Sequence, residues 1–537
     1  MSNMRIPGLA SGMDTDAMVQ SMMKVERLKV DRYEQSKQIA LWRQEAYINT
    51  NKMFANFILN TQKDMGLKKA SSTGSLSNVS YSRLDYVRKA TSSNETAATV
   101  SATSEAVNGS YEIKVDDLAT SATYASAKVK DTKINSNSLK FNIKLGEVSE
   151  TIEVSGADGT TINMNDVVKA INKDSKEVTA FYDENNGRLF IQSKDTGDKG
   201  EITLEAIGGE GSSSDNLIKT LKGNGLDNKE ISNQGQDAKI IFNGVELSYS
   251  SNNINLNGLN IQLKAKGVTN INVNTNVDGI MEKIEKFVND YNELIDKASK
   301  SVNEKRYTKY HPLSQEEKKA MHQDDAKLWE EKAKSGMLNR DETIQRTLQN
   351  IRTDLYKNVE GLDGSFKHIT EIGITTEKYS KGATGGKLQI DKDKLRAAIE
   401  KDPEGVMKLL FNEPDVKKDG MSEAEYKKAV SNKSGVFTRI YDNLTDGMKS
   451  IIDKSGPGED ADLFRSVQFN ILIDFRTKKS SISDLDKEIL DANKKIDDLN
   501  VMLYRKENAY YAKFANMEKM LSQMNSQSNW LSQQFMR

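Results

Sequence analysis

The residue types that usually carry enzyme chemistry are sparse in this sequence. Its three histidines, His311, His322 and His368, are far apart, and none falls in an H-E-x-x-H spacing. Isolated histidines of this kind are typical of solvated surface side chains. The segment GATGGK at 382–387 resembles a phosphate loop in composition, but it lacks the G-x-x-x-x-G-K-[ST] spacing and precedes a predicted strand at 388–390. We therefore expect no enzymatic activity, with no catalytic, cofactor-binding or metal site.

The charge balance restricts the kinds of partner. Lys and Arg (77) nearly cancel Asp and Glu (78), and no basic run is present, so we expect no nucleic-acid partner. No apolar stretch reaches 18 residues, so we expect no membrane insertion. The first residues lack the basic and apolar regions of a secretory signal. A chain without cysteine is most simply cytosolic, but export in an unfolded state is the alternative, and composition does not decide between them.

Long helices are predicted at both ends of the chain. Residues 14–64 contain no Gly or Pro, and Asp14 or Thr15 is a plausible N-cap. Near the C-terminus, apolar residues follow an alternating spacing of three and four, broken at Lys506 and Lys513: Ile482, Leu485, Ile489, Ala492, Ile496, Leu499, Leu503, Tyr510, Met517, Met520 and Met524. This heptad pattern indicates a coiled coil or a long bundle helix. The two terminal helices most simply pack against each other.

The middle of the chain is predicted to be β-rich. Short runs alternate apolar and polar residues, as half-buried strands do, at 111–115, 141–145, 151–154, 178–182 and 188–191. A second group follows at 239–242, 245–249, 259–263 and 270–273, with a hairpin turn at Asn243-Gly244. Helical periodicity returns after Asp278, and Asp402-Pro403 is an N-cap followed by proline. The fold class is therefore α+β and multidomain: a coiled-coil or helix-bundle stem with β-rich domains inserted, one of them within the other.

Methionine and aromatic residues collect at the two ends. They are either ordinary helix core or an adaptable contact surface, because methionine is flexible and suits interfaces that must repack. The candidate filament or self-assembly contacts are Met18, Met22, Met23, Met517, Leu521, Met524, Trp530, Leu531 and Phe535. Trp530 and Phe535 lie in a polar tail, which is a poor core and a reasonable docking segment.

Six blocks of the sequence resemble one family in the family's own order. They are GLASGMDTDAMV at 8–19, WRQEAYINT at 42–50, NGSYEIKVDDLA at 108–119, QDAKIIFNGV at 236–245, FVNDYNELI at 287–295, and IGIT at 372–375 followed by GKLQIDKDKL at 386–395. The sequence is similar to the flagellar cap family, also called hook-associated protein 2. The stretch 307–337 departs from it, being longer than the family's usual connection, and either packs beside the stem or adds a contact.

The resemblance implies a division of the chain. Residues 1–40 would form an N-terminal leg segment, 41–75 a stem helix, and 76–130 with 234–275 the two parts of one β-domain. An inserted β-rich domain would occupy 131–233, and a helical stem domain 276–504, with an insertion near 301–337. Residues 505–537 would form a C-terminal leg segment.

The resemblance also implies a function. The chain would be a structural cap at the tip of the bacterial flagellum, extracellular, and exported through the flagellar secretion channel without a cleaved signal peptide. Its partners would be further copies of itself in a ring-shaped homo-oligomer, a pentamer, together with flagellin, an export chaperone and the secretion apparatus. Two alternatives stay open: an adhesin that binds host glycans or mucin through the β-domains, and an enzyme hidden in the β-region.

Overall fold

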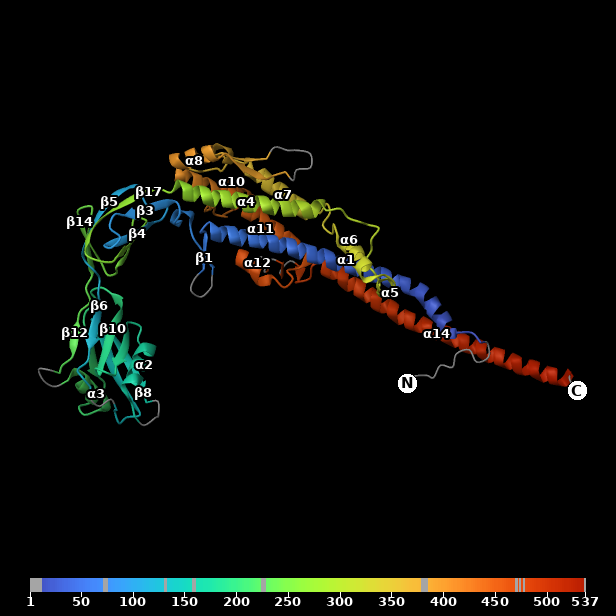
Figure 1. The fold of residues 1–537 in the computed structure, drawn as a ribbon, viewed down its shortest axis with the longest axis horizontal. Helices are drawn as coiled ribbons and strands as arrows, with labels where there is room; N and C mark the ends of the chain where they lie inside the picture. Colours follow the sequence, from blue (N-terminus) through green and yellow to red (C-terminus); the bar gives the residue numbers. More distant parts are fainter. Residues whose placement is uncertain are drawn as a thin grey trace. The chain divides into compact units, whose positions relative to one another are not determined.

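Two segments far apart in the sequence form one unit, and the segment between them forms another. The structure, a computed structural model, describes residues 12–70, 76–129, 133–156, 161–223, 228–377, 385–468, 472, 475–476 and 479–535, without the side chains of Ala70 and Phe535 (Figure 1). Met1–Asn78 and Met281–Arg537 make up the first unit, which is mainly helical. Val79–Ile280 make up the second, which is mainly β.

The helical unit is built around two long helices and a bundle. α1 (Thr15–Asp64) begins at the N-cap Asp14, whose side chain accepts a hydrogen bond from the Ala17 N–H and so satisfies a free donor of the first turn. The other helices are α4 Val277–Asn303, α5 Gln315–Ala320, α6 Gln323–Lys334, α7 Glu342–Leu355, α8 Lys392–Lys401, α9 Pro403–Phe411, α10 Glu423–Lys433, α11 Val436–Ser455, α12 Ala461–Val467 and α14 Asp484–Phe535. Short pieces complete it: β1 Lys68–Ala70, β2 Leu76–Asn78, the 3-10 helix η2 Ile369–Ile372, β18 Ile374–Thr376 and β19 Leu388–Ile390.

Aromatic side chains hold the bundle together. The Phe287 ring of α4 stacks on that of Phe437 in α11, with centroids 3.7 Å apart, and lies 5.7 Å from that of Phe57 in α1. The Tyr441 hydroxyl donates to the Thr61 hydroxyl at 3.0 Å, which satisfies a buried polar group. These contacts join α1 to α4 and α11 in one core.

The β unit contains two cores. The first takes residues from 98–119 and 238–273, and the second takes residues from 122–221, which lie between those two stretches in the sequence. The elements of this unit are η1 Tyr81–Arg83, β3 Arg88–Ser92, β4 Ala98–Ala102, β5 Gly109–Asp117, β6 Ser121–Ala125, β7 Ser138–Leu145, β8 Val148–Ser155, α2 Met164–Asp174, β9 Val178–Asp183, β10 Arg188–Thr196, β11 Ile202–Ala206, α3 Ser213–Lys222, β12 Ile231–Asn233, β13 Ala238–Phe242, β14 Val245–Tyr249, β15 Asn253–Leu256, β16 Leu259–Leu263 and β17 Gly267–Thr275.

Each core lies between two sheets. The first lies between the sheets β14-β13-β5-β17-β3 and β15-β16-β4, and the second is bounded by β12-β6-β10-β9 and β11-β7-β8.

Two asparagine-glycine turns set the hairpins of the first core. Asn243 and Gly244, between β13 and β14, both have positive φ, at 48° and 84°. Asn257 and Gly258, between β15 and β16, have φ of 49° and 78°. Two successive positive φ values define the type I′ turn, whose twist matches that of paired strands. The turn predicted at Asn243 is therefore confirmed.

The predicted fold class is confirmed, and the details refine it. Asp402 caps α9 and Pro403 is its first residue, as expected from the sequence. Helix α3 was not expected. The insertion near 301–337 forms α5 and α6. Inside it, Trp329 Nε1 donates to the His311 carbonyl at 2.9 Å. Lys334 Nζ joins the insertion to α1, because it donates to the Glu45 carboxylate at 2.8 Å. Half of the GATGGK segment, residues 382–384, lies outside the described residues, as do residues 8–11 of the first family block.

Candidate functional site

The two terminal helices pair along a shared apolar seam. Val19, Met23 and Val30 of α1 are buried against Ile496 and Leu503 of α14, with Leu499, Tyr510, Tyr511 and Phe514 packed at the edges. The helices run in opposite directions side by side, so the beginning of α1 meets the middle of α14, and the end of α14 extends past it (Figure 1). The expected packing of the two ends against each other is confirmed.

The structure bears out part of the apolar row predicted on α14 after Leu503. Tyr510 packs at the edge of the seam and Met517 is half-buried, but Met520 and Met524 are exposed, and Phe514, which was not predicted, also packs at the edge. A straight α-helix has 3.6 residues per turn, so a 3.5-residue repeat drifts around it by about 20° per heptad. The drift turns the predicted row away from the seam toward the end of the helix, and this corrects the prediction for Met520 and Met524.

Charged and polar groups fix the pairing at both ends of the seam. Lys506 of α14 lies 2.7 Å from the Glu26 carboxylate of α1, and a hydrogen bond from Lys506 lowers the pKa of Glu26. Ser483 caps α14: its hydroxyl accepts from the Asp486 N–H at 3.1 Å, and its own N–H donates to the Asp486 carboxylate. Gln44 Nε2 donates to Asp486 Oδ1 at 2.7 Å and so joins this cap to α1.

The structure separates the predicted contact residues into three groups. Met23 is 5% exposed and belongs to the chain's own core. Met517 and Leu521 are half-buried. Met18, Met22, Met524, Trp530 and Leu531 are exposed, Met22 to 42% and Trp530 to 60%. Phe535 ends α14, and its side chain lies outside the described residues. We use the name terminal stripe for the exposed apolar side chains near the end of α14, which are Met520, Met524, Trp530 and Leu531.

The terminal stripe is apolar in a tail that carries no charge. Between Lys519 and Arg537 the sequence has no charged residue. Every described side chain from Ser522 to Gln534 is exposed, including Met524, Trp530 and Leu531. Exposed large apolar side chains grouped on one helix indicate a protein-binding surface. An amphipathic helix of this kind can dock into a groove or pair with another helix.

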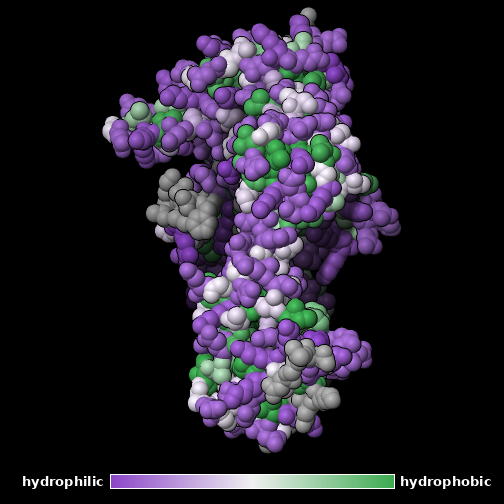
Figure 2. Space-filling model, turned by 90° about the vertical axis from the view of Figure 1, so that its left-hand side faces the viewer, coloured by the Kyte–Doolittle hydropathy of each residue, from purple (hydrophilic) through white to green (hydrophobic). Residues whose placement is uncertain are grey.

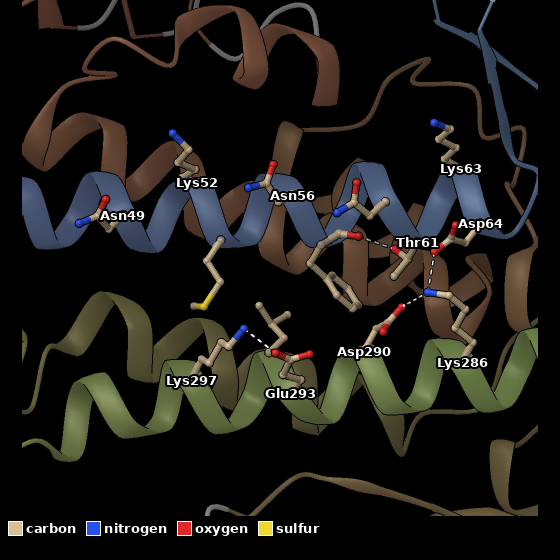
Figure 3. A pocket seen from close by; sticks show the side chains of 14 residues that line it. Asn49, Lys52, Asn56, Thr61, Lys63, Asp64, Lys286, Asp290, Glu293 and Lys297 are labelled. Carbon is tan, nitrogen blue, oxygen red and sulfur yellow. Dashed lines mark hydrogen bonds and ion pairs between the residues drawn. The ribbon is translucent and has the colours of Figure 1, made fainter.

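A groove runs between α1 and α4 in the helical unit. It holds about 700 Å³, with Met53, Phe57 and Leu294 among its lining residues (Figure 3). Lys286 lies 2.7 Å from Asp64 and 2.9 Å from Asp290, and Lys297 lies 2.5 Å from Glu293. These ion pairs offset part of the charge that lines the groove.

Sequence reasoning missed a polar network inside the second family block. The Tyr47 hydroxyl donates to the carboxylate of Asp341, the N-cap of α7, and Lys454 of α11 lies 3.6 Å from the same carboxylate. Burial and the bond to Asp341 raise the pKa of Tyr47. Asn51 donates to the Met448 carbonyl of α11. Gln44, Tyr47 and Asn51 are spaced three and four residues apart, which places them on one face of α1, and this spacing was the available signal.

The histidines lie outside these networks. His311 Nε2 donates a hydrogen bond to the Glu317 carboxylate at 2.9 Å near the surface, and His368 caps η2. Within the described ranges, no cluster of His, Asp and Glu side chains could hold a metal ion. No helix of the described part has the length and apolar character of a membrane span.

The geometry defines a class of protein: a multidomain α+β protein whose two terminal helices pair along an apolar seam and leave exposed apolar side chains near the end of α14. Three family models match the chain. "Flagellar hook-associated protein 2 C-terminus" matches residues 235–526, more than half of the sequence; "Flagellar hook-associated protein 2 N-terminus" matches 11–122; and "Flagellin hook IN motif" matches 132–195. The chain belongs to the flagellar hook-associated protein 2 family.

Relatives and a solved structure agree with this membership. Flagellar hook-associated protein 2 of Halalkalibacterium halodurans is 28% identical over 574 residues, covering 99% of this chain and all of the relative. The Escherichia coli K12 protein of the same name is 26% identical and covers 87% of this chain and 88% of its own. The D1-D2-D3 domains of the flagellar cap protein FliD from E. coli match with a TM-score of 0.50 and 23% identity, over 74% of this chain and 96% of theirs, which shows the fold.

Proposed function

We propose that this protein caps the distal end of the bacterial flagellar filament and promotes the ordered insertion of exported flagellin subunits. The observation that carries the proposal is the exposed apolar tip of the α1–α14 coiled coil. Membership of the hook-associated protein 2 family supports the location, and the E. coli structure with this fold is titled a flagellar cap protein. The relatives' names give no support to an adhesin for host glycans or mucin.

The cap acts by contact and not by enzymatic chemistry. Identical copies form a ring, with five as the working number, and the terminal segments act as legs that contact flagellin. Each leg adds a weak contact, and several legs on one ring add up to firm seating through effective concentration. Weak contacts by methionine and leucine side chains also suit a cap that moves as each subunit is inserted.

The proposed location requires export. The chain travels through the flagellar secretion channel without a cleaved signal peptide, with help from an export chaperone, and becomes extracellular at the filament tip. The absence of cysteine fits this route, because a thiol-free chain forms no disulfide while it is unfolded outside the cell.

The tip is tested by changing two side chains in the bacterium that makes this protein. Trp530→Ser with Leu531→Ser removes two of the exposed apolar groups of the terminal stripe. Loss of such anchors costs on the order of 2 kcal/mol or more per leg, multiplied over the ring. The strain should release flagellin monomers into the medium, carry short filaments or none, and swim poorly, as measured by electron microscopy and by immunoblots of the medium.

The matched control changes two exposed polar neighbours, Asn529→Ser with Gln533→Ser, which should leave filaments at full length. Immunoblots must show equal export of both variants. Full-length filaments in a strain that exports the Trp530 and Leu531 variant normally would contradict the proposed role of the tip.

A further inference from the structure

All sulfur atoms of this chain belong to methionine side chains. The sequence contains 20 methionines and no cysteine, so each sulfur is a thioether. Oxidation of a thioether gives a sulfoxide, which turns a flexible apolar side chain into a polar one, and dedicated reductases reverse the change. The oxidant must reach the sulfur, so the exposure of each methionine determines where this reaction occurs.

The structure divides the methionines by exposure. Among those that it describes, Met520 and Met524 of the terminal stripe are the most exposed, at 66% and 63%. Met23, which lies in the seam between α1 and α14, is 5% exposed. Further methionines are buried in the cores, namely Met65, Met164, Met281, Met407 and Met448. The two methionines near the end of α14 are therefore the thioethers most accessible to a dissolved oxidant.

Met520 and Met524 share one face of α14 with Leu531. The three positions are separated by four and seven residues, which places them within about 40° of one another around the helix axis. All three side chains are exposed, in the part of α14 that extends past α1 (Figure 1). Thioethers therefore make up two of the three exposed apolar side chains on this face.

The segment around this face differs in composition from the rest of the surface. Figure 2 shows a face of the molecule on which hydrophilic side chains predominate, and 29% of all residues in the chain are charged. The segment 520–536, by contrast, contains no charged residue. Ion pairs therefore contribute nothing to a contact made by this segment, and its apolar side chains must supply the affinity.

Oxidation by hydrogen peroxide changes this apolar character directly. The sulfur lone pair attacks one peroxide oxygen, an S–O bond forms as the O–O bond breaks, and the second oxygen leaves as water after proton transfer. The sulfur loses two electrons and the peroxide gains them. The sulfoxide oxygen accepts hydrogen bonds from water, and burying it against a partner without a donor costs free energy.

We propose that Met520 and Met524 form a peroxide-sensitive site in the terminal stripe, and that conversion of both thioethers to sulfoxides releases this tip from the surface it binds. The inference rests on the proposed function, in which the tip contacts flagellin. Two unpaired polar groups in the contact lower the affinity by about 10-fold or more. Reduction of the two sulfoxides restores the contact.

The first experiment needs no partner. The full-length protein is treated with hydrogen peroxide, the reaction is stopped with catalase, and peptide mass spectrometry follows each methionine. Sulfoxides at Met520 and Met524 should form first, at least about 10-fold faster than at the buried Met23, because solvent reaches only the exposed sulfurs. The circular dichroism spectrum should stay unchanged at this stage. Equal rates of oxidation at Met23 and Met524 would overturn the proposed site.

The second experiment measures binding to short filaments polymerised from purified flagellin of the bacterium that makes this protein. Co-sedimentation gives the affinity of each variant before and after peroxide treatment, and the ratio of the two affinities is compared. The unchanged protein should lose about 10-fold or more. Met520→Leu with Met524→Leu keeps apolar side chains without thioethers, so its ratio should stay near one. Met421→Leu with Met502→Leu removes two exposed thioethers outside the terminal stripe and should lose affinity as the unchanged protein does.

Methionine sulfoxide reductases complete the test, because they act on the sulfoxides and leave other oxidative damage in place. The treated protein should bind again once Met520 and Met524 are reduced. Lack of recovery, an equal loss in the Met520→Leu and Met524→Leu variant, or full binding by protein that carries both sulfoxides would overturn the proposed sensitivity and leave the cap function standing. If the untreated protein binds no filaments, the proposed function fails and the sensitivity fails with it.

Discussion

At the scale of single residues, Arg439 of α11 is the side chain with the densest set of polar contacts. It is 1% exposed, and its guanidinium donates to five backbone carbonyls, those of Ser431, Asn432, Asp354, Lys357 and Asn358. Burial lowers the pKa of Arg439, but arginine stays charged in proteins. One planar cation therefore joins the ends of α7 and α10 to α11.

Replacing Arg439 by methionine should destabilise the helical unit by about 3 kcal/mol or more. Methionine fills a similar volume but leaves buried carbonyls without their donors, and bonds to a charged group contribute about 1.5–3 kcal/mol each, less than additively. The measurement is urea unfolding followed by tryptophan fluorescence. All three tryptophans, Trp42, Trp329 and Trp530, lie in the helical unit, so the signal reports this unit alone.

Arg465→Met is the control for the loss of an arginine. Arg465 forms an exposed ion pair with Asp462 at 2.8 Å, and such pairs contribute about 0–1 kcal/mol. Equal destabilisation by both substitutions would show that the five carbonyl contacts of Arg439 add nothing beyond a surface charge.

At the scale of elements, the pairing of α1 with α14 divides neighbouring methionines between two roles. Met23 lies in the seam, and Met22, one residue earlier, is 42% exposed on another face of the same helix. Successive residues of a helix are about 100° apart, so adjacent side chains of one type can serve the core and the surface.

Met23→Ala should weaken the pairing of the two helices by about 2–3 kcal/mol, because a buried methionine loses its contacts and leaves a cavity. Met22→Ala should cost less than about 0.5 kcal/mol, since its side chain is largely solvated. Hydrogen exchange of the backbone amides at 15–30 separates the two: only Met23→Ala should accelerate exchange there. Equal acceleration by both substitutions would mean that the seam does not hold in solution.

At the scale of the whole molecule, the β unit is an insertion whose ends meet. Arg88 of β3 lies opposite Thr275 of β17, and the Asn276 N–H donates to the Val87 carbonyl at 3.0 Å. When the first and last strands of a segment pair with each other, their hydrogen bonds hold the two ends of the segment together. Such a segment can fold without contacts from the rest of the chain.

Residues 79–280 should therefore fold alone. The fragment should be soluble and monomeric at low micromolar concentration, with a β-type circular dichroism spectrum and cooperative thermal unfolding. The remaining chain, Met1–Asn78 joined by a short Gly-Ser linker to Met281–Arg537, should give a helical spectrum. A random-coil spectrum for residues 79–280 would contradict the division into two units.

Local signals in the sequence determined much of this protein. The N-cap at Asp14, the proline-initiated helix at Pro403, the turn at Asn243-Gly244 and the α+β class all follow from side-chain chemistry within a few residues, and the structure contains each of them. The ordered family blocks further predicted the family. The domain bounds and the flagellin contacts of the terminal residues remain predictions.

Only the tertiary structure decided which side chains face a partner inside the chain. The exposure of Met520 and Met524, the burial of Met23 beside the exposed Met22, and the link from Tyr47 to Asp341 depend on helices that lie far apart in the sequence. The stacking of Phe181 on Phe190 likewise depends on the register between β9 and β10. Periodicity gives the spacing of residues along one element, whereas the face that an element buries is fixed by its neighbours in space, and those neighbours lie far away in the sequence.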